Sequence, residues 1–357
     1  MRGRSVRGGA GSGPPRRLGR RTYATLGAGL AAALLGACGA GPASPKTSST
    51  LPPAAEPGHA PVPTATPAGT VVSLGAGTFP EGIVADATTG LVAAGQQSPP
   101  ALDLLDQSGH LVARVALPAG PRHLALEAPG GPVLVPSEKS GRLVKVSIKT
   151  KAITAQIHTG VHPHDVAVAD GRLFVANEFS NTVTVISGTK VVKDITVPQQ
   201  PGGIAATGDR VAEISVRARK MDVIDAKTLR TVAVLPVGVG PTHDVGYRNR
   251  FYVVDTEGGA LLTYSATPTV RLISSAKLAG APYGMALDPV HARLWVTLTA
   301  TNRLVAFDLG TGTPKMVASF PTVRQPNTVA VDPTTGNVFV AGNADGVIEV
   351  IPPSAQG

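Results

Sequence analysis

The chain has a single cysteine, few aromatic residues and no apolar run long enough to cross a bilayer, and each scarcity excludes a class of protein. One Cys among 357 residues cannot pair within the chain, so a disulfide-stabilised scaffold is excluded. Aromatic residues make up only 4% of the sequence, which argues against a carbohydrate site built on stacked rings. Hydrophobic residues nevertheless make up 43%, which is enough to build a core and excludes disorder throughout.

Acidic residues are absent from residues 1–37, and this segment accounts for most of the net charge of +9. It carries seven Arg, so the rest of the chain has 25 basic side chains against 23 acidic ones, a net of +2. No basic stripe with interleaved aromatics, the pattern typical of nucleic-acid binding, is visible there. We therefore expect no nucleic-acid partner.

The N-terminus has the pattern of a secretory signal. Residues 1–21 are basic, and residues 24–37 are a run of 14 small and apolar residues, too short for a membrane-spanning helix. The run ends in Leu35-Gly36-Ala37-Cys38, which resembles the lipobox of bacterial lipoproteins. The resemblance implies that residues 1–37 are a signal peptide, that Cys38 is lipidated, and that the protein is anchored to the outer face of the bacterial cytoplasmic membrane. A coincidental Cys is the alternative.

Two further features belong to this end of the chain. Arg20-Arg21-Thr22-Tyr23 resembles the core of a twin-arginine signal without its flanking residues, so twin-arginine and general secretory export both stay open. Residues 39–69 contain eight Pro and only two charged side chains, Lys46 and Glu56. Such a composition buries too little apolar surface to fold, and its Pro content favours an extended spacer. We predict that residues 38–69 are a linker.

From residue 70 the sequence repeats seven times with a period of 38 to 44 residues. Each repeat begins with a proline that precedes an apolar run: Pro80, Pro121, Pro163, Pro201, Pro241, Pro282 and Pro326. Three further short runs follow in each repeat, separated by turns rich in Gly, Asn and Asp. Four strands in about 40 residues are the unit of a β-propeller blade. No long helical period interrupts them.

The last repeat ends after its third strand, at residues 347–351, while a fourth-type strand stands at residues 70–74. Pairing these two segments closes the ring and removes its exposed edge. We predict an all-β fold over residues 70–357, a seven-bladed β-propeller with four-stranded antiparallel blades in which an N-terminal strand completes the last blade.

The repeats resemble the YVTN or YncE-like propellers. The closest match is Phe174-Val175-Ala176-Asn177 followed by residues 180–186, and blade six repeats the pattern at residues 295–297 and 302–308. The Gly-His and Trp-Asp signatures of WD40 repeats are absent. The resemblance covers residues 70–351 and implies an architecture rather than an activity.

The strand after each proline is the innermost strand of a propeller blade, so the residues that follow the prolines crowd the mouth of the central channel. Loops between second and third strands lie on the same face. The residues that we predict to contact a ligand there are Glu81, Arg122, His123, His164, Glu178, His243, Asp255, Tyr283 and Asn327.

Two motifs at the mouth combine His with a carboxylate: His162-Pro163-His164-Asp165 and Thr242-His243-Asp244. Such pairs can bind a metal or act as a general base. They can also hydrogen-bond to a neighbouring blade and hold the ring together, or contact a ligand without chemistry. The candidate catalytic residues are His164, His243 and Asp244. The candidate metal ligands are His164, His243 and Glu178.

Two principal functions follow. The first is a membrane-anchored, extracytoplasmic scaffold that binds a small molecule or an envelope protein at the channel mouth without catalysis, as a monomer. The alternative is a metal-dependent lyase or hydrolase resembling streptogramin-lyase or lactonase propellers, in which a metal or a His sits in the mouth; it would use His164 and His243 with Glu81, Glu178 or Asp244. A third function that the sequence leaves open is a purely structural module of the cell envelope.

The sequence shows no G-x-S-x-G motif and no phosphate-binding loop. We predict no cofactor other than a divalent metal at the mouth.

Overall fold

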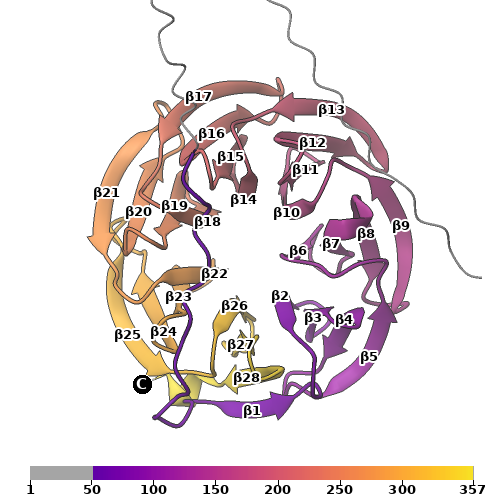
Figure 1. Ribbon diagram of the computed structural model, residues 1–357, viewed down its shortest axis with the longest axis vertical. Helices are drawn as coiled ribbons and strands as arrows, with labels where there is room; N and C mark the ends of the chain where they lie inside the picture. The colour runs from indigo at the N-terminus through magenta and orange to yellow at the C-terminus, as the bar shows by residue number, and fades with distance from the viewer. Residues whose placement is uncertain (1–50, 357) are drawn as a thin grey trace, which may run out of the picture. The chain divides into compact units, whose positions relative to one another are not determined.

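Seven antiparallel sheets of four strands each surround a central channel (Figure 1). The computed structural model describes residues 51–356. In six sheets the strands follow chain order from the channel outward, and in the seventh the outermost strand comes from the beginning of the described chain. The prediction of an all-β, seven-bladed propeller is confirmed. None of the helices in the described part of the chain has the length and apolar character needed to span a membrane.

The blades are named in chain order. Blade 1 contains β2 (Pro80–Asp86), β3 (Leu91–Gln97), β4 (Pro100–Leu105) and β5 (Leu111–Ala116). Blade 2 contains β6 (Ala125–Leu126), β7 (Val133–Ser137), β8 (Arg142–Ser147) and β9 (Ala152–His158), with a 3-10 turn at Glu138–Ser140. Blade 3 contains β10 (Pro163–Ala169), β11 (Arg172–Asn177), β12 (Thr182–Ser187) and β13 (Lys190–Thr196). Blade 4 contains β14 (Pro201–Thr207), β15 (Arg210–Ser215), β16 (Lys220–Asp225) and β17 (Arg230–Pro236).

The remaining blades follow the same order. Blade 5 contains β18 (Pro241–Tyr247), β19 (Arg250–Asp255), β20 (Ala260–Ser265) and β21 (Arg271–Lys277). Blade 6 contains β22 (Pro282–Asp288), β23 (Arg293–Leu298), β24 (Arg303–Asp308) and β25 (Lys315–Pro321). Blade 7 contains β26 (Pro326–Val331), β27 (Val338–Gly342), β28 (Val347–Ile351) and β1 (Thr70–Ser73), followed by a 3-10 turn at Pro353–Ala355.

The ring is closed by β1, as predicted. It runs antiparallel to β28, from the pair Thr70 and Val350 to the pair Ser73 and Val347. Gly69, the residue before β1, donates its N–H to Oε1 of Glu349 at 2.7 Å. The first and last strands of the propeller therefore share one sheet, and neither leaves the ring open.

The hydrophobic core consists of seven separate clusters, one between each pair of neighbouring blades. Phe174 of blade 3, for example, packs with Val211 and Ile224 of blade 4, and all three are fully buried. Trp295 of blade 6 packs in the same way against Val338 of blade 7. Because each blade is buried on both faces, its second and third strands are buried along most of their length, as β11 and β12 show.

An irregularity after the proline recurs at the start of the innermost strands. In blades 1, 3, 4, 5, 6 and 7 the register with the second strand shifts just after this proline. Such a bulge releases one or two residues from the ladder and re-aims their side chains. The bulges fall on the residues that the sequence analysis placed at the channel mouth, so this local backbone feature turns them toward the channel.

Blade 2 departs from the repeat. Its innermost strand β6 has only two residues, and Pro121 forms an isolated bridge with Ser137. The residues between them, 122–124, lie outside any strand. His123 thus has no strand pairing, and its backbone donates an N–H to the carbonyl oxygen of His164 at 3.3 Å.

The described part of the predicted linker, residues 51–69, lies against the ring instead of standing free of it (Figure 1). Gly58 donates its N–H to Oγ1 of Thr299 at 2.8 Å and accepts a bond from Nε2 of Gln325 at 2.9 Å. Asn302 donates to the carbonyl oxygen of Pro61 at 2.9 Å. This corrects the expectation of a free spacer for these residues. An extended, Pro-rich segment needs no core of its own, because side chains of the blades supply its few hydrogen-bond partners.

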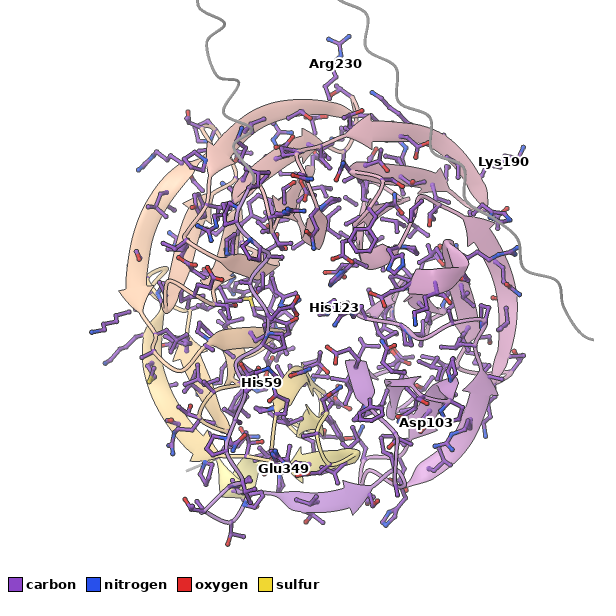
Figure 2. The ribbon with its side chains drawn as sticks, in the orientation of Figure 1. His59, Asp103, His123, Lys190, Arg230 and Glu349 are labelled. Carbon is purple, nitrogen blue, oxygen red and sulfur yellow. The ribbon has the colours of Figure 1, made fainter. Side chains whose placement is uncertain are left out.

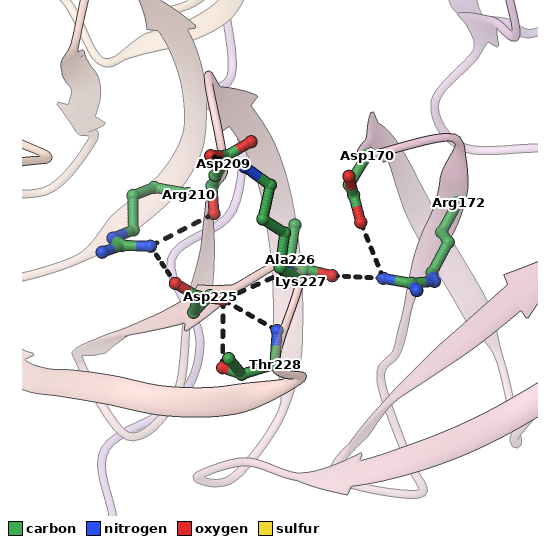
Figure 3. A network of polar contacts seen from close by, with 8 residues as sticks. All are labelled: Asp170, Arg172, Asp209, Arg210, Asp225, Ala226, Lys227 and Thr228. Carbon is green, nitrogen blue, oxygen red and sulfur yellow. Dashed lines mark hydrogen bonds and ion pairs between the residues drawn. The ribbon is translucent and has the colours of Figure 1, made fainter.

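Neighbouring blades are also joined at the lower face, the one opposite the mouth. Arg172, at the start of β11, donates to Asp170 at 2.9 Å and to the carbonyl oxygen of Ala226 in blade 4 (Figure 3). Asp225 accepts bonds from the N–H and hydroxyl of Thr228 and is paired with Arg210. None of the predicted site residues takes part in this network, so its role is to stabilise the ring.

Candidate functional site

Three histidines from three different blades meet at the upper end of the channel, where the innermost strands begin. His123, His164 and His243 come from blades 2, 3 and 5, and Figure 2 shows His123 pointing toward the central opening. The ring of His123 lies 4.4 Å from that of His243 and 5.2 Å from that of His164, measured between centroids. One ring nitrogen from each residue lies within 4.8 Å of the other two. We call these residues the histidine cluster.

Two of these rings are oriented by a neighbour outside the cluster. Nδ1 of His243 lies 3.2 Å from the carbonyl oxygen of Tyr283. Nδ1 of His164 lies 3.6 Å from Oε2 of Glu178, whose other oxygen accepts a bond from Gln200 at 2.8 Å. His123 has no such neighbour among the described residues, and its Nε2 is buried without a hydrogen-bond partner there.

Two members of the histidine cluster, His123 and His243, favour the uncharged form of imidazole. Burial lowers the pKa of His243 to about 3, and the nearby His164 acts in the same direction. Burial also holds the pKa of His123 well below its usual range, with His243 and His164 lowering it further. Three rings this close cannot all carry a proton, because like charges would repel in a site shielded from water.

Below the histidine cluster is a channel cavity of about 360 Å³, lined by the innermost strands. His123, Asp165, His243, Asp244 and Thr328 supply its main polar side chains, and most of the remaining wall is apolar. This volume falls within the range of small-molecule sites, and a few polar groups in an apolar wall are typical of them.

Asp244 is the most unusual group in this cavity. It is 7% exposed, and neither of its carboxylate oxygens has a hydrogen-bond partner among the described residues. Burial raises its pKa well above the usual range, and the neighbouring Asp165 raises it further. Asp165 accepts bonds from the N–H groups of Val166 and Ile204, but burial still raises its pKa to about 6.

The predicted residues on the other side of the mouth are engaged with one another. Arg122 donates to Glu138 at 3.0 Å and lies 4.0 Å from Glu81. Glu81 accepts bonds from Asn327 at 3.0 Å and from Asn343 at 2.9 Å. These contacts join blades 1, 2 and 7, so Glu81, Arg122 and Asn327, which the sequence predicted as ligand contacts, are bonded to neighbouring blades.

Asp255 and Tyr283 occupy different positions from those expected of ligand contacts. Asp255 accepts N–H bonds from Val239, Gly240 and Gly258 at 2.7 to 3.1 Å, so it caps turns of its own blade. Tyr283 packs edge-on against His243 with ring centroids 4.4 Å apart. It therefore supports the histidine cluster from the side.

The space above the histidine cluster is nearly closed. A small pocket of about 30 Å³ lies there, lined by Ala54–Glu56 of the N-terminal segment together with His164, His243 and Tyr283. It has room for about one water molecule. The room for a ligand is therefore in the channel cavity below the histidines and not at the open mouth that the sequence suggested.

The structure also regroups the candidate metal ligands. His164 and His243 are brought together with His123, whereas Glu178 belongs to a second group with Glu138 and His162. In that second group Glu138 is paired with Arg122, and Glu178 is bonded to Gln200. The carboxylates of the second group are thus already partly occupied, which leaves the histidine cluster as the better set of ligands.

Sequence reasoning missed Glu213, on β15 of blade 4. It is fully buried, accepts bonds from Ser215 at 3.0 Å, and burial raises its pKa well above the usual range. Asp222 and Asp244 act in the same direction. The available signal was an acid inside an apolar second strand, Ala212-Glu213-Ile214.

No protein-family model matches this chain, and no curated protein matches its sequence. Solved structures share the fold. A chain of Kuenenia stuttgartiensis hydrazine synthase is 19% identical with a TM-score of 0.66, over 78% of this chain and 96% of that one. A streptogramin B lyase is 13% identical with a TM-score of 0.67, over 79% and 97%. Virginiamycin B lyase from Staphylococcus aureus, bound to quinupristin, is 13% identical with a TM-score of 0.65, over 79% and 98%. At these identities the likeness establishes the propeller fold alone.

Replacing Asp244 by Asn should stabilise the protein. The substitution keeps the side-chain shape but removes a buried carboxylate that has no partners. Such a carboxylate lowers the free energy of unfolding of the wild type by about 1–3 kcal/mol. Because the folded protein holds the Asp244 proton more tightly than the unfolded chain does, this cost appears as pH rises, so the gain should be larger at pH 8 than at pH 5. Urea unfolding at both pH values measures it.

Asp255→Asn is the matched control, since Asp255 is also buried but accepts three N–H bonds. We expect this variant to be destabilised by a similar amount. A destabilised Asp244→Asn variant would mean that Asp244 has structural partners after all.

Proposed function

We propose that this protein is a lipid-anchored, extracytoplasmic β-propeller that binds a small organic cation in its central channel. The single observation that carries the proposal is the carboxylate of Asp244, buried beside a cavity of about 360 Å³ with neither oxygen partnered among the described residues. A buried acid without partners destabilises a fold by itself, and a bound cation would supply the missing interaction.

The charge around the channel supports a cation over an anion. The carboxylates of Glu81, Glu138 and Glu178 surround the mouth, and those of Asp165 and Asp244 line the cavity below. Arg122 is the basic side chain paired among them, and the histidines His123 and His243 favour their neutral form. A cleft lined by one sign of charge attracts ligands of the opposite sign.

The proposed extracytoplasmic, lipid-anchored location of the propeller is inferred from the sequence alone. The basic segment, the apolar run and Cys38 lie outside the described residues, and their roles as signal peptide and anchor stay predictions. They support the proposal because a channel facing the surroundings of the cell, tethered by a lipid, is suited to capture a ligand there. Catalysis is not needed for this function.

Isothermal titration of the protein with putrescine and tetramethylammonium tests the proposal. We expect saturable binding of at least one of them, weakened tenfold or more in Asp244→Asn, because a charge-assisted contact contributes about 1.5–3 kcal/mol. Asp209→Asn, which removes an acid outside the channel, is the control and should bind as the wild type does. Absence of binding, or equal binding by the Asp244 variant, contradicts the proposal.

A further inference from the structure

The proposed organic ligand does not account for the histidine cluster. Its three rings come from blades 2, 3 and 5, yet His123 and His243 lie within 4.4 Å between centroids, and His164 and His243 within 6.4 Å. None of the hydrogen bonds among the described residues joins one of these rings to another. Three imidazoles that each place a ring nitrogen within 4.8 Å of the other two, without bonds to one another, have lone pairs that a metal ion could use.

The absence of a side chain in blade 4 makes this convergence possible. At the corresponding position blade 4 has Gly202 and Gly203, so it places no side chain between blades 3 and 5. A Cβ atom on Gly203 would lie 2.9 Å from Oδ1 of Asp244 and 3.1 Å from Cα of His243. Glycine there leaves room for both of these residues.

The outer contacts of the rings are those that metal-binding histidines make. The Nδ1 atom of His243 faces the carbonyl oxygen of Tyr283, which leaves Nε2 of that ring free. The Nδ1 atom of His164 has no hydrogen-bond partner among the described residues, but it lies 3.6 Å from Oε2 of Glu178, a carboxylate that Gln200 holds in place. A carbonyl or a carboxylate on the far nitrogen fixes the tautomer and orients the ring toward a metal.

We propose that His123, His164 and His243 together bind one divalent transition-metal ion of the zinc class, with a fourth position open toward the channel. Three imidazoles and an open position form a common zinc ligand set, with nitrogen atoms about 2.0–2.1 Å from the ion. In a tetrahedral site with these bond lengths the ligand atoms lie about 3.3–3.4 Å apart. The ring nitrogens, which are separated by up to 4.8 Å, must therefore close by up to about 1.4 Å when the ion binds.

The surroundings are suited to such an ion. The carboxylate of Glu178, 3.6 Å from Nδ1 of His164, offsets part of the charge of a dication. The inference goes beyond the proposed function and does not depend on it, because an amine held by Asp244 need not touch the histidines.

Titration of the EDTA-treated full chain with CoCl₂ tests the inference directly. Cobalt in a nitrogen-rich, four-coordinate site gives strong visible absorption, and we expect one equivalent to bind and to be displaced by ZnSO₄. His243→Ala and His123→Ala should each lower the affinity at least 100-fold. Glu178→Gln, which changes only an outer contact, should lower it 10- to 100-fold. His291→Ala, at an exposed histidine outside the cluster, should bind as the wild type does.

Thermal unfolding of each variant shows whether it is folded, and His243→Gln replaces His243→Ala if the latter is not. Wild-type protein without a visible cobalt spectrum overturns the inference. So does cobalt binding that is lost in His162→Ala but retained in His243→Ala, since the ion would then sit on the second group. Because none of these variants is used to test amine binding, failure here leaves the proposed function to its own experiment.

Discussion

A chain that begins at Leu74 should be about 4–6 kcal/mol less stable toward unfolding than one that begins at Thr66, because each lost backbone hydrogen bond costs about 1 kcal/mol. The shorter chain lacks β1, whose four residues pair with β28. The loss of Gly69 also leaves the buried carboxylate of Glu349 without one of its donors. Both chains lack residues 51–65, so their difference isolates the closing strand.

Urea unfolding and sedimentation velocity measure the two consequences. Removing β1 uncovers the edge of β28, and an open strand edge pairs with other chains. We therefore expect the shorter chain to self-associate as well as to unfold at lower urea concentration. Equal stability of two monomeric chains would show that closure of the ring does not depend on β1.

The second large effect concerns a buried ion pair in blade 1. Asp103 is fully buried and receives bonds from Arg114 at 2.6 and 2.8 Å and from Gln96 at 3.0 Å. Arg114→Ala leaves this carboxylate buried without its cation, so we expect a loss of about 3–5 kcal/mol of unfolding free energy. Asp103→Ala should cost less, because the side chain of Arg114 is 38% exposed and water can solvate it.

A double variant, Asp103→Val with Arg114→Met, separates the two explanations of that loss. If the cost comes from the isolated charge, removing both partners should return the stability to within about 1 kcal/mol of the wild type. Chemical unfolding of the single and double variants measures the coupling. Additive losses would mean that the pair contributes through packing instead.

The architecture was predictable because it depends on local patterns. The prolines at Pro80 to Pro326 recur at one spacing, and the alternation of short apolar runs with turn residues specifies strands wherever it occurs. The incomplete last repeat predicted that residues near Thr70 pair with the strand ending at Ile351. Blade 2 is the exception, because residues 122–124 leave the strand while the repeat pattern continues through them.

The site was predictable only as a set of positions. Histidines after Pro163 and Pro241 were expected at the mouth, and His164 and His243 do lie there. Asp255 looked equivalent to the other polar residues, but its N–H partners are set by the local turn. The distances across the channel decide which candidate residues contact one another. Local patterns along the chain do not predict these distances.

The contacts of the N-terminal segment, residues 51–69, were likewise not predictable from local sequence patterns. Its composition correctly indicated that residues 51–69 have no core of their own. It could not indicate that Gly58 fits tightly against Ala281 and Ala300, or that Ala54–Glu56 cover the histidine cluster. Docking of an extended segment depends on partners that lie more than 200 residues away.

The sequence by itself determined the repeat, the strands and the closed ring, because alternation and turn chemistry act between neighbours along the chain. Only the tertiary structure decided that His123 joins His164 and His243, that Asp244 remains without a partner among the described residues while Asp255 finds three, and that the channel cavity is where a ligand fits. These outcomes depend on how blades pack around an axis. Gly203 of blade 4, for example, leaves room for Asp244 and His243 of blade 5.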